Sequence, residues 1–162
     1  MNKRFGLILF LFAAISAAGL FLWRWQVIPD EKVTINGITV PPVPQLDAGD
    51  LSQGREIYSQ QCASCHGTEL EGVSGWKISQ PDGTLLPPPH DSGGHTWHHP
   101  DALLLKIISE GGQPENGNMP SFGEVLSEDE IHKVLTFIKS SWGAEEREFQ
   151  WWISFTQNSF YE

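Results

Sequence analysis

The five residues Cys62-Ala63-Ser64-Cys65-His66 decide the fold of this 162-residue chain. In a helix the two thiols lie one turn apart, close enough to add to the two vinyl groups of a single haem. The imidazole that follows then falls under the iron as the proximal ligand. The motif therefore predicts one covalently attached haem c, with Cys62 and Cys65 carrying the thioethers and His66 bound to the iron.

Two other kinds of site use a pair of cysteines at this spacing. A zinc site needs a second Cys/His pair at matched spacing, and the chain has no further cysteine. A redox-active dithiol of the thioredoxin kind lies in a βαβ context, which the sequence does not show. Covalent haem is the favoured interpretation, and half a zinc site and a redox-active dithiol are the alternatives.

A second axial ligand is expected at Met119. The chain has two methionines, and the other one is Met1. Met119 lies in Asn118-Met119-Pro120, within a polar, glycine-rich loop where a thioether has little core to fill. Ligation by His and Met raises the reduction potential and closes both faces of the iron. This coordination suits electron transfer and leaves no place for a substrate.

The residues around the motif predict helices. One begins at about Asp50 and leads into the motif, and a second is expected from about Pro100 to Gly111. A third opens with the capping box Ser127-Glu128-Asp129-Glu130 and runs with apolar residues at helical spacing to about Trp142. We see no run of strands long enough for a sheet. We therefore expect an all-α fold of three to five helices around one haem.

Residues before and after the motif strengthen this expectation: Gly54-Arg55-Glu56-Ile57-Tyr58, Met119-Pro120, and a last helix ending at Trp142. Together with the motif they make residues 50–142 resemble a class I c-type cytochrome, of the membrane-anchored monohaem type. The resemblance implies that the first and last helices cross, with Gly54 and Tyr58 at the contact. It also implies that a prolyl carbonyl, which we assign to Pro88, accepts a hydrogen bond from His66 and tunes the iron.

The chain departs from the simplest members of that family in two places. The loop from His66 to Pro87-Pro88-Pro89 is longer, and His90 stands where an apolar residue is more usual. Both departures concern the packing on the His66 side of the haem.

Four histidines crowd into ten residues: His90, His95, His98 and His99. The segment from Gly94 to Pro100 resembles one found in membrane-anchored monohaem cytochromes. This resemblance favours a role beside the haem, in which Trp97 with His95 or His98 binds the propionates or closes the loop over the haem edge. A second metal site for copper or zinc, an alternative haem ligand, and solvent-exposed histidines are the alternatives.

Residues 1–28 predict a membrane anchor. The 19 residues from Phe5 to Trp23 carry no charge and span about 28 Å as a helix, close to the thickness of a bilayer core. Lys3 and Arg4 would stay in the cytoplasm, which places the rest of the chain outside. A cleaved signal peptide is the alternative. Residues 29–49 predict a hairpin that turns at Asn36-Gly37, followed by a proline-rich linker.

The haem domain is expected to span residues 50–143 and to be followed by an aromatic-rich tail, residues 144–162. Six aromatic residues lie between positions 149 and 161. They predict either a strap packed across the haem domain, which we favour, or a docking surface for a membrane complex or the bilayer interface.

The charge of the chain restricts its partners. Ten basic against twenty acidic residues give a formal charge of −10, and the part after residue 28 carries −13. This charge argues against nucleic acid and favours a redox protein with a basic docking patch.

The functional prediction is a membrane-anchored c-type cytochrome that passes single electrons between redox partners on the periplasmic side of the cytoplasmic membrane, and not an enzyme. A haem subunit of a larger membrane oxidoreductase, a haem protein with a copper site at the histidine cluster, and a ligand-binding or peroxidase-like haem protein with a labile Met119 are the alternatives.

Overall fold

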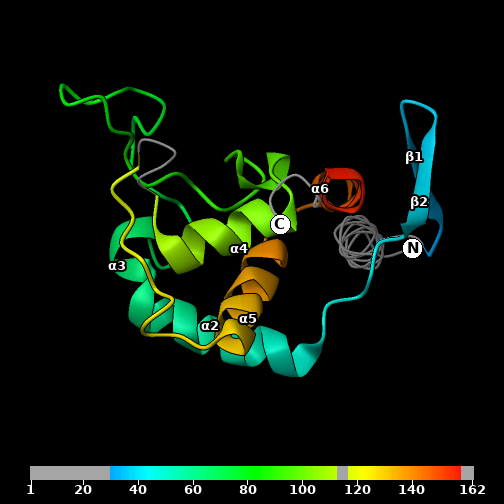
Figure 1. Cartoon of the computed structure of the whole chain (residues 1–162), viewed down its shortest axis with the longest axis horizontal. Coiled ribbons are helices and arrows are strands. Elements are labelled where there is room, and N and C mark those ends of the chain that lie inside the picture. Colours follow the sequence, from blue (N-terminus) through cyan, green and yellow to red (C-terminus); the bar gives the residue numbers. More distant parts are fainter. Residues whose placement is uncertain (1–29, 113–116, 158–162) are drawn as a thin grey trace, which may run out of the picture.

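The described structure is mostly helical (Figure 1). It is a computed structural model that describes residues 30–112 and 117–157. Along the chain the elements are β1 (Lys32–Ile35), β2 (Ile38–Pro42), α2 (Ala48–Gln61), α3 (Ala63–His66), the 3-10 turn η1 (Thr96–His98), α4 (Asp101–Glu110), α5 (Glu128–Lys139) and α6 (Ala144–Gln157). The three helices expected from the sequence correspond to α2, α4 and α5.

Local capping signals determine where these helices begin and end. The Asp47 carboxylate accepts hydrogen bonds from the backbone N–H groups of Gly49 and Asp50, at 2.8 and 3.0 Å, and so starts α2. Ser127 and Glu130 form the reciprocal capping box of α5. Gly111 ends α4 with φ of 92°, a backbone conformation that favours glycine. The capping box at Ser127 is therefore confirmed.

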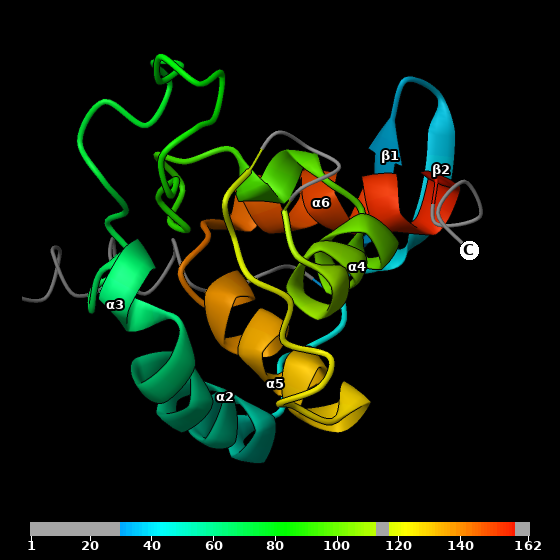
Figure 2. The same cartoon turned by 60° about the vertical axis from the view of Figure 1, so that its left-hand side comes forward.

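Helices α2 and α5 cross closely and form the main core (Figure 2). A Cβ atom on Gly54 would lie 1.9 Å from the carbonyl oxygen of Lys133, so only glycine allows this approach. One turn further on, the rings of Tyr58 and Phe137 pack with centroids 5.2 Å apart. The surrounding buried cluster contains Leu70, Leu104, Val134, Leu135, Ile138 and Trp142.

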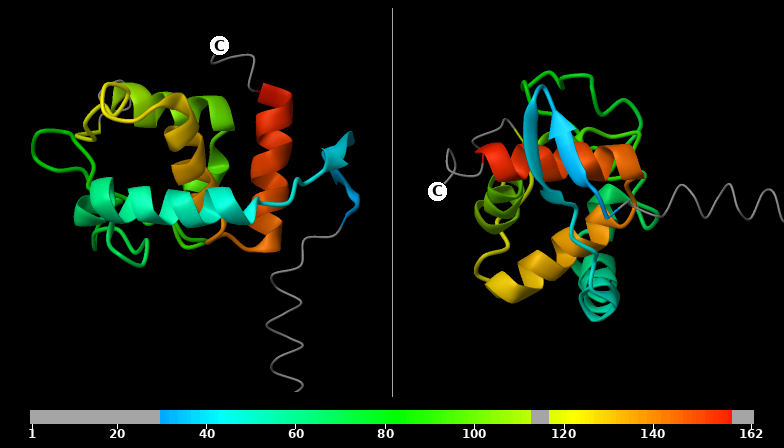
Figure 3. Two further views of the ribbon diagram at one scale, coloured as in Figure 1. Left: turned by 90° about the horizontal axis from the view of Figure 1, so that it is seen from below. Right: turned by 90° about the vertical axis from the view of Figure 1, so that its right-hand side faces the viewer.

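Helix α6 separates this core from the hairpin (Figure 3). Strands β1 and β2 pair antiparallel with Val33 opposite Val40, and the turn places Asn36 and Gly37 at φ of 51° and 77°. The hairpin buries its valines against Ala144, Trp151 and Trp152 of α6. An isolated hairpin is only marginally stable, so α6 supplies the apolar surface that it needs.

On its other face α6 is tied to α4 by polar side chains. Gln150 donates to an Asp101 carboxylate oxygen at 2.6 Å and to the Ser154 hydroxyl at 2.9 Å. The Ser154 hydroxyl in turn accepts the backbone N–H of Asp101 at 2.9 Å. Gln150 and Ser154 are buried, and these bonds satisfy their polar atoms.

The predicted fold class is wrong in two respects. The fold is not all-α, because the hairpin forms a two-stranded sheet that packs on α6. The transmembrane helix is not supported either: no helix within residues 30–112 and 117–157 is long and apolar enough to cross a bilayer. The segment predicted to form that helix, residues 1–28, lies outside the described residues.

Candidate haem site

The cysteine motif forms its own short helix directly after α2. Cys62 ends α2 and precedes α3, and its carbonyl oxygen accepts the backbone N–H groups of Cys65 and His66 at 3.1 and 3.0 Å. This single turn holds two free thiols and the imidazole together, with Cys62 half-buried and Cys65 exposed. The structure therefore presents all three groups of the predicted haem attachment on one turn.

The thiol of Cys62 is kept protonated by its surroundings. Burial, and to a smaller extent the neighbouring Cys65, raises the pKa of Cys62 to about 11. A redox-active dithiol depends on a thiolate with a lowered pKa. Cys62 therefore does not supply such a thiolate at neutral pH.

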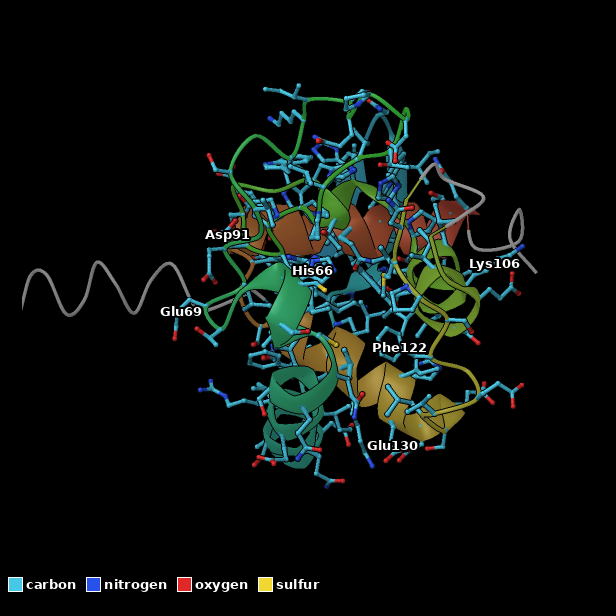
Figure 4. All side chains as sticks on the ribbon, turned by 90° about the vertical axis from the view of Figure 1, so that its left-hand side faces the viewer. His66, Glu69, Asp91, Lys106, Phe122 and Glu130 are labelled. Carbon is cyan, nitrogen blue, oxygen red and sulfur yellow. The ribbon has the colours of Figure 1, made fainter. Side chains whose placement is uncertain are left out.

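The imidazole of His66 is buried and held by a hydrogen bond at Nδ1. Its Nδ1 atom lies 3.1 Å from the carbonyl oxygen of Pro88. A carbonyl can only accept, so Nδ1 carries the proton and Nε2 keeps its lone pair for a metal. Burial lowers the pKa of His66, although the bond to Pro88 opposes this shift, so the neutral ring is favoured. Figure 4 shows His66 directed toward the centre of the molecule, while Glu69 and Asp91 lie at its outside.

Backbone contacts bring Pro88 to this position. Gly72 donates its N–H to the His66 carbonyl at 2.8 Å, and Val73 donates to Pro87 at 2.9 Å. A Cβ on Gly72 would lie 2.4 Å from the Pro89 nitrogen, and its φ of 62° also favours glycine. The long loop thus returns beside the motif because a glycine lets the two chain segments approach.

His90 lies against the face of His66. The two rings stack with centroids 4.1 Å apart and planes 24° apart. The Nδ1 atom of His90 and the Thr96 hydroxyl form a hydrogen bond of 2.9 Å. Burial, together with His66 and His95, holds the pKa of His90 well below its usual range. The sequence singled out His90 as unusual at its position but did not indicate this contact.

Two buried polar atoms at the start of η1 have no partner in the described part of the chain. They are Nε1 of Trp97 and Nδ1 of His95. The ring of His95 stacks on Trp76 at 4.9 Å, and exposed His98 stacks on Trp97 at 3.7 Å. A buried donor left unpaired costs about 1–3 kcal/mol, so these atoms indicate where a polar group of a ligand belongs.

Within the described residues the side chains of the histidine cluster are not arranged as a second metal site. The rings of His90, His95 and His98 stack on different partners, namely His66, Trp76 and Trp97. Within residues 30–112 and 117–157 no group of three or more His, Cys, Asp or Glu side chains is arranged to hold a metal ion. The copper and zinc alternatives are therefore not supported.

Tyr58 and Met119 lie in different parts of the core. The hydroxyl of buried Tyr58 donates to the Gly67 carbonyl at 3.0 Å and so holds the turn after the motif. Half-buried Met119 packs against a second cluster, made of Ile108, Leu126, Ile131 and their neighbours. Its carbonyl accepts the N–H of Gly112 at 3.0 Å, which ties its loop to the end of α4.

A family model matches residues 49–138 of the chain, and this family is described as cytochrome c oxidase, cbb3-type, subunit III. The chain is 33% identical to the gluconate 2-dehydrogenase cytochrome c subunit of Pantoea cypripedii over 103 residues, which are 59% of this chain and 21% of that relative. It is 30% identical to cytochrome c6 of Rippkaea orientalis over 97 residues, 59% of this chain and 74% of that relative.

A third relative is the cbb3-type cytochrome c oxidase subunit FixP of Azorhizobium caulinodans, with 28% identity over 62% of this chain and 32% of the relative. The chain spans only about a fifth of the gluconate dehydrogenase subunit and about a third of this oxidase subunit. No solved structure matches the chain.

The family model covers more than half of the chain, and the helical motif and buried histidine agree with it. The chain therefore belongs to the family of cbb3-type cytochrome c oxidase subunit III and is a class I c-type cytochrome, an electron-transfer domain with covalently bound haem c.

Proposed function

We propose that this chain carries single electrons between redox proteins through one haem c, without acting as an enzyme. Cys62 and Cys65 would hold the haem by thioethers, and His66 would bind its iron through Nε2. The observation that supports this proposal most directly is the hydrogen bond from Nδ1 of buried His66 to the Pro88 carbonyl. This bond leaves Nε2 as the ligand atom. When bound, the haem supplies an iron that changes its charge by one electron.

The residues of the site fit a haem in two further respects. The two thiols are free and lie on the turn that carries the imidazole, as two thioethers to one haem require. Trp97 and His95 each bury a polar nitrogen that has no partner within residues 30–112 and 117–157. The carboxylates of a haem would pair with these nitrogens. We therefore assign Trp97 and His95 to the propionates. His98, which stacks on the outer side of Trp97, supports that ring instead.

Met119 is proposed as the second axial ligand. The loop that carries Met119 is held through its backbone. Gly112 donates its N–H to the Met119 carbonyl, and a Cβ on Gly111 would lie 2.9 Å from the same oxygen. The main chain at Met119 is thus held against the end of α4, next to Gly111 and Gly112. An iron bound by both His66 and Met119 would have no coordination site left for a substrate, which is why we propose a carrier.

A haem subunit of a larger oxidoreductase is the second candidate function. The relatives from Pantoea cypripedii and Azorhizobium caulinodans are named as subunits of a dehydrogenase and an oxidase. With twenty acidic residues against ten basic ones, the chain suits a partner that offers a basic patch. The proposed location outside the cytoplasm rests on the sequence alone.

Optical spectra of the purified protein in both oxidation states test the proposal. We expect a six-coordinate low-spin haem in both states, with the weak methionine-to-iron charge-transfer band in the oxidised form. Met119→Ala should abolish that band and allow CO to bind the reduced iron, and His66→Ala should abolish low-spin coordination. A wild-type protein that binds CO without any substitution would contradict the proposal. Co-purification with a partner from mild detergent would favour the second candidate.

A further inference from the structure

We propose that His90 is a positioning residue that fixes the plane of the His66 imidazole by stacking on it. This inference rests on the proposed function, because it concerns His66 as the iron ligand. The two rings lie with centroids 4.1 Å apart and planes 24° apart, so their faces are in contact.

One hydrogen bond alone does not fix the plane of an imidazole. The Nδ1–H group lies in the plane of its own ring, and its bond to the Pro88 carbonyl sets the position of Nδ1. The ring can still tilt about that bond, because tilting keeps the hydrogen-bond distance. A second ring packed on its face removes this remaining freedom. Pro88 thus restrains the Nδ1 edge of the His66 ring, and His90, two residues further on, restrains its face.

His90 can act in this way because its own position is fixed by several bonds. Its N–H donates to the Leu70 carbonyl at 2.8 Å. Its carbonyl accepts both the indole N–H of Trp142 at 2.8 Å and the hydroxyl of Ser141 at 2.7 Å. On the side chain, Nδ1 is bound to Thr96, which is buried. The ring is therefore held by segments that are up to 52 residues away in the sequence.

The orientation of an axial imidazole affects the electronic structure of a low-spin iron, and hydrogen bonding and packing around a ligand tune its potential. A change in the ring plane is thus measurable without any partner protein. The proposal predicts that losing the flat ring of His90 has a larger effect than losing its bond to Thr96.

Two variants separate these properties. His90→Phe keeps a flat ring on His66 and loses the bond to Thr96, whereas His90→Gln keeps a polar side chain and loses the ring. His132→Ala is the matched control, because it removes an exposed imidazole of α5. The readouts are proton NMR of the ferric haem methyl groups, the electron paramagnetic resonance g values, and the reduction potential of the full-length protein carrying haem.

We expect His132→Ala to match the wild type and His90→Phe to stay close to it. We expect His90→Gln to shift the methyl resonances, the g values and the potential. Equal shifts in His90→Phe and His90→Gln would overturn the proposal, as would a wild-type spectrum for His90→Gln. If His90→Gln fails to retain haem, His90→Leu repeats the test with the same two outcomes. A wild-type protein without His-ligated low-spin haem would instead refute the proposed function, and this inference with it.

Discussion

The tryptophans of two regions of the molecule differ in what their indole N–H groups contact. Between the hairpin and α6, Trp151 donates to the Pro41 carbonyl at 2.8 Å and Trp152 donates to the Ile38 carbonyl at 3.2 Å. Beside the cysteine motif, the Nε1 atom of Trp97 is buried and has no partner in the described chain. A region that serves only packing satisfies its polar atoms internally, whereas a binding site leaves them for its ligand.

The two regions also differ in the kind of contact that stabilises them. The hairpin and α6 close on each other with valines, tryptophans and backbone carbonyls. The segment from Leu70 to Trp97 packs around buried His66. It ends at two ring nitrogens that have no partner among the described residues. The first region should therefore be stable by itself, and the second should depend on the haem.

Removal of the haem should give the largest effect and tests this contrast directly. In Cys62→Ala/Cys65→Ala we expect loss of covalent haem and a loss of amide protection in residues 67–99 of at least about tenfold, since each orphaned donor costs about 1–3 kcal/mol. Protection in residues 32–43 and 144–157 should change far less. Hydrogen exchange followed by mass spectrometry measures both regions in one sample, and equal loss in both would remove the distinction.

A cavity between the hairpin and α6 should lower the stability of the protein and leave the haem site unchanged. Val40 is 1% exposed, and Val40→Ala removes two methyl groups from the cluster that faces α6. We expect the free energy of unfolding to fall by about 2 kcal/mol, with the haem spectrum and reduction potential unchanged. Denaturant titration and a spectroelectrochemical titration check the two parts. A shifted potential would show that the two regions are coupled.

Matched substitutions of two tryptophans should sharpen the comparison. Trp97→Phe removes the unpaired N–H, so a propionate would lose its donor and stay more negative, which stabilises the ferric state and lowers the reduction potential. Trp151→Phe removes a satisfied N–H and should cost about 1 kcal/mol of stability without changing the potential. Potential and denaturation midpoint are measured for both variants. The assignment of Trp97 fails if its substitution leaves the potential unchanged.

The smallest effect is expected at the start of α5, which belongs to neither region. The hydrogen bonds from Ser127 lower the pKa of Glu130. A lowered pKa in the folded state means that Glu130 adds stability above its unfolded pKa and that this contribution is lost as the pH falls through the folded value. Wild type should therefore lose more stability than Glu130→Gln between about pH 5 and pH 3. Denaturation at several pH values measures this, and parallel profiles would argue against it.

The sequence predicted those elements whose signals are local. The capping box at Ser127 and the turn at Asn36-Gly37 each lie within a few residues, and both are present. Pro88 was selected only through a resemblance, and the structure places its carbonyl 3.1 Å from His66. The crossing of α2 and α5 at Gly54 was also expected only through the resemblance. The structure gives the physical reason, because a Cβ on Gly54 would clash with the Lys133 carbonyl.

The long-range contacts could not be read from the sequence. The bonds from Trp151 and Trp152 to the hairpin join residues 110 and 114 positions apart, so the aromatic tail gave no sign that it forms α6 and covers a sheet. The stacking of His90 on His66 depends on Ser141 and Trp142, which lie more than 50 residues further along. Such contacts arise from packing of the whole core, and no periodicity or motif reports them.

Mass spectrometry of a proteolytic digest tests the central claim most directly, since the claim is one haem c held by Cys62 and Cys65. The account predicts a single peptide containing residues 62–66 that is heavier by one haem after denaturation, with neither cysteine open to alkylation. A peptide of unmodified mass with two alkylated cysteines, or with a Cys62–Cys65 disulfide, would contradict it.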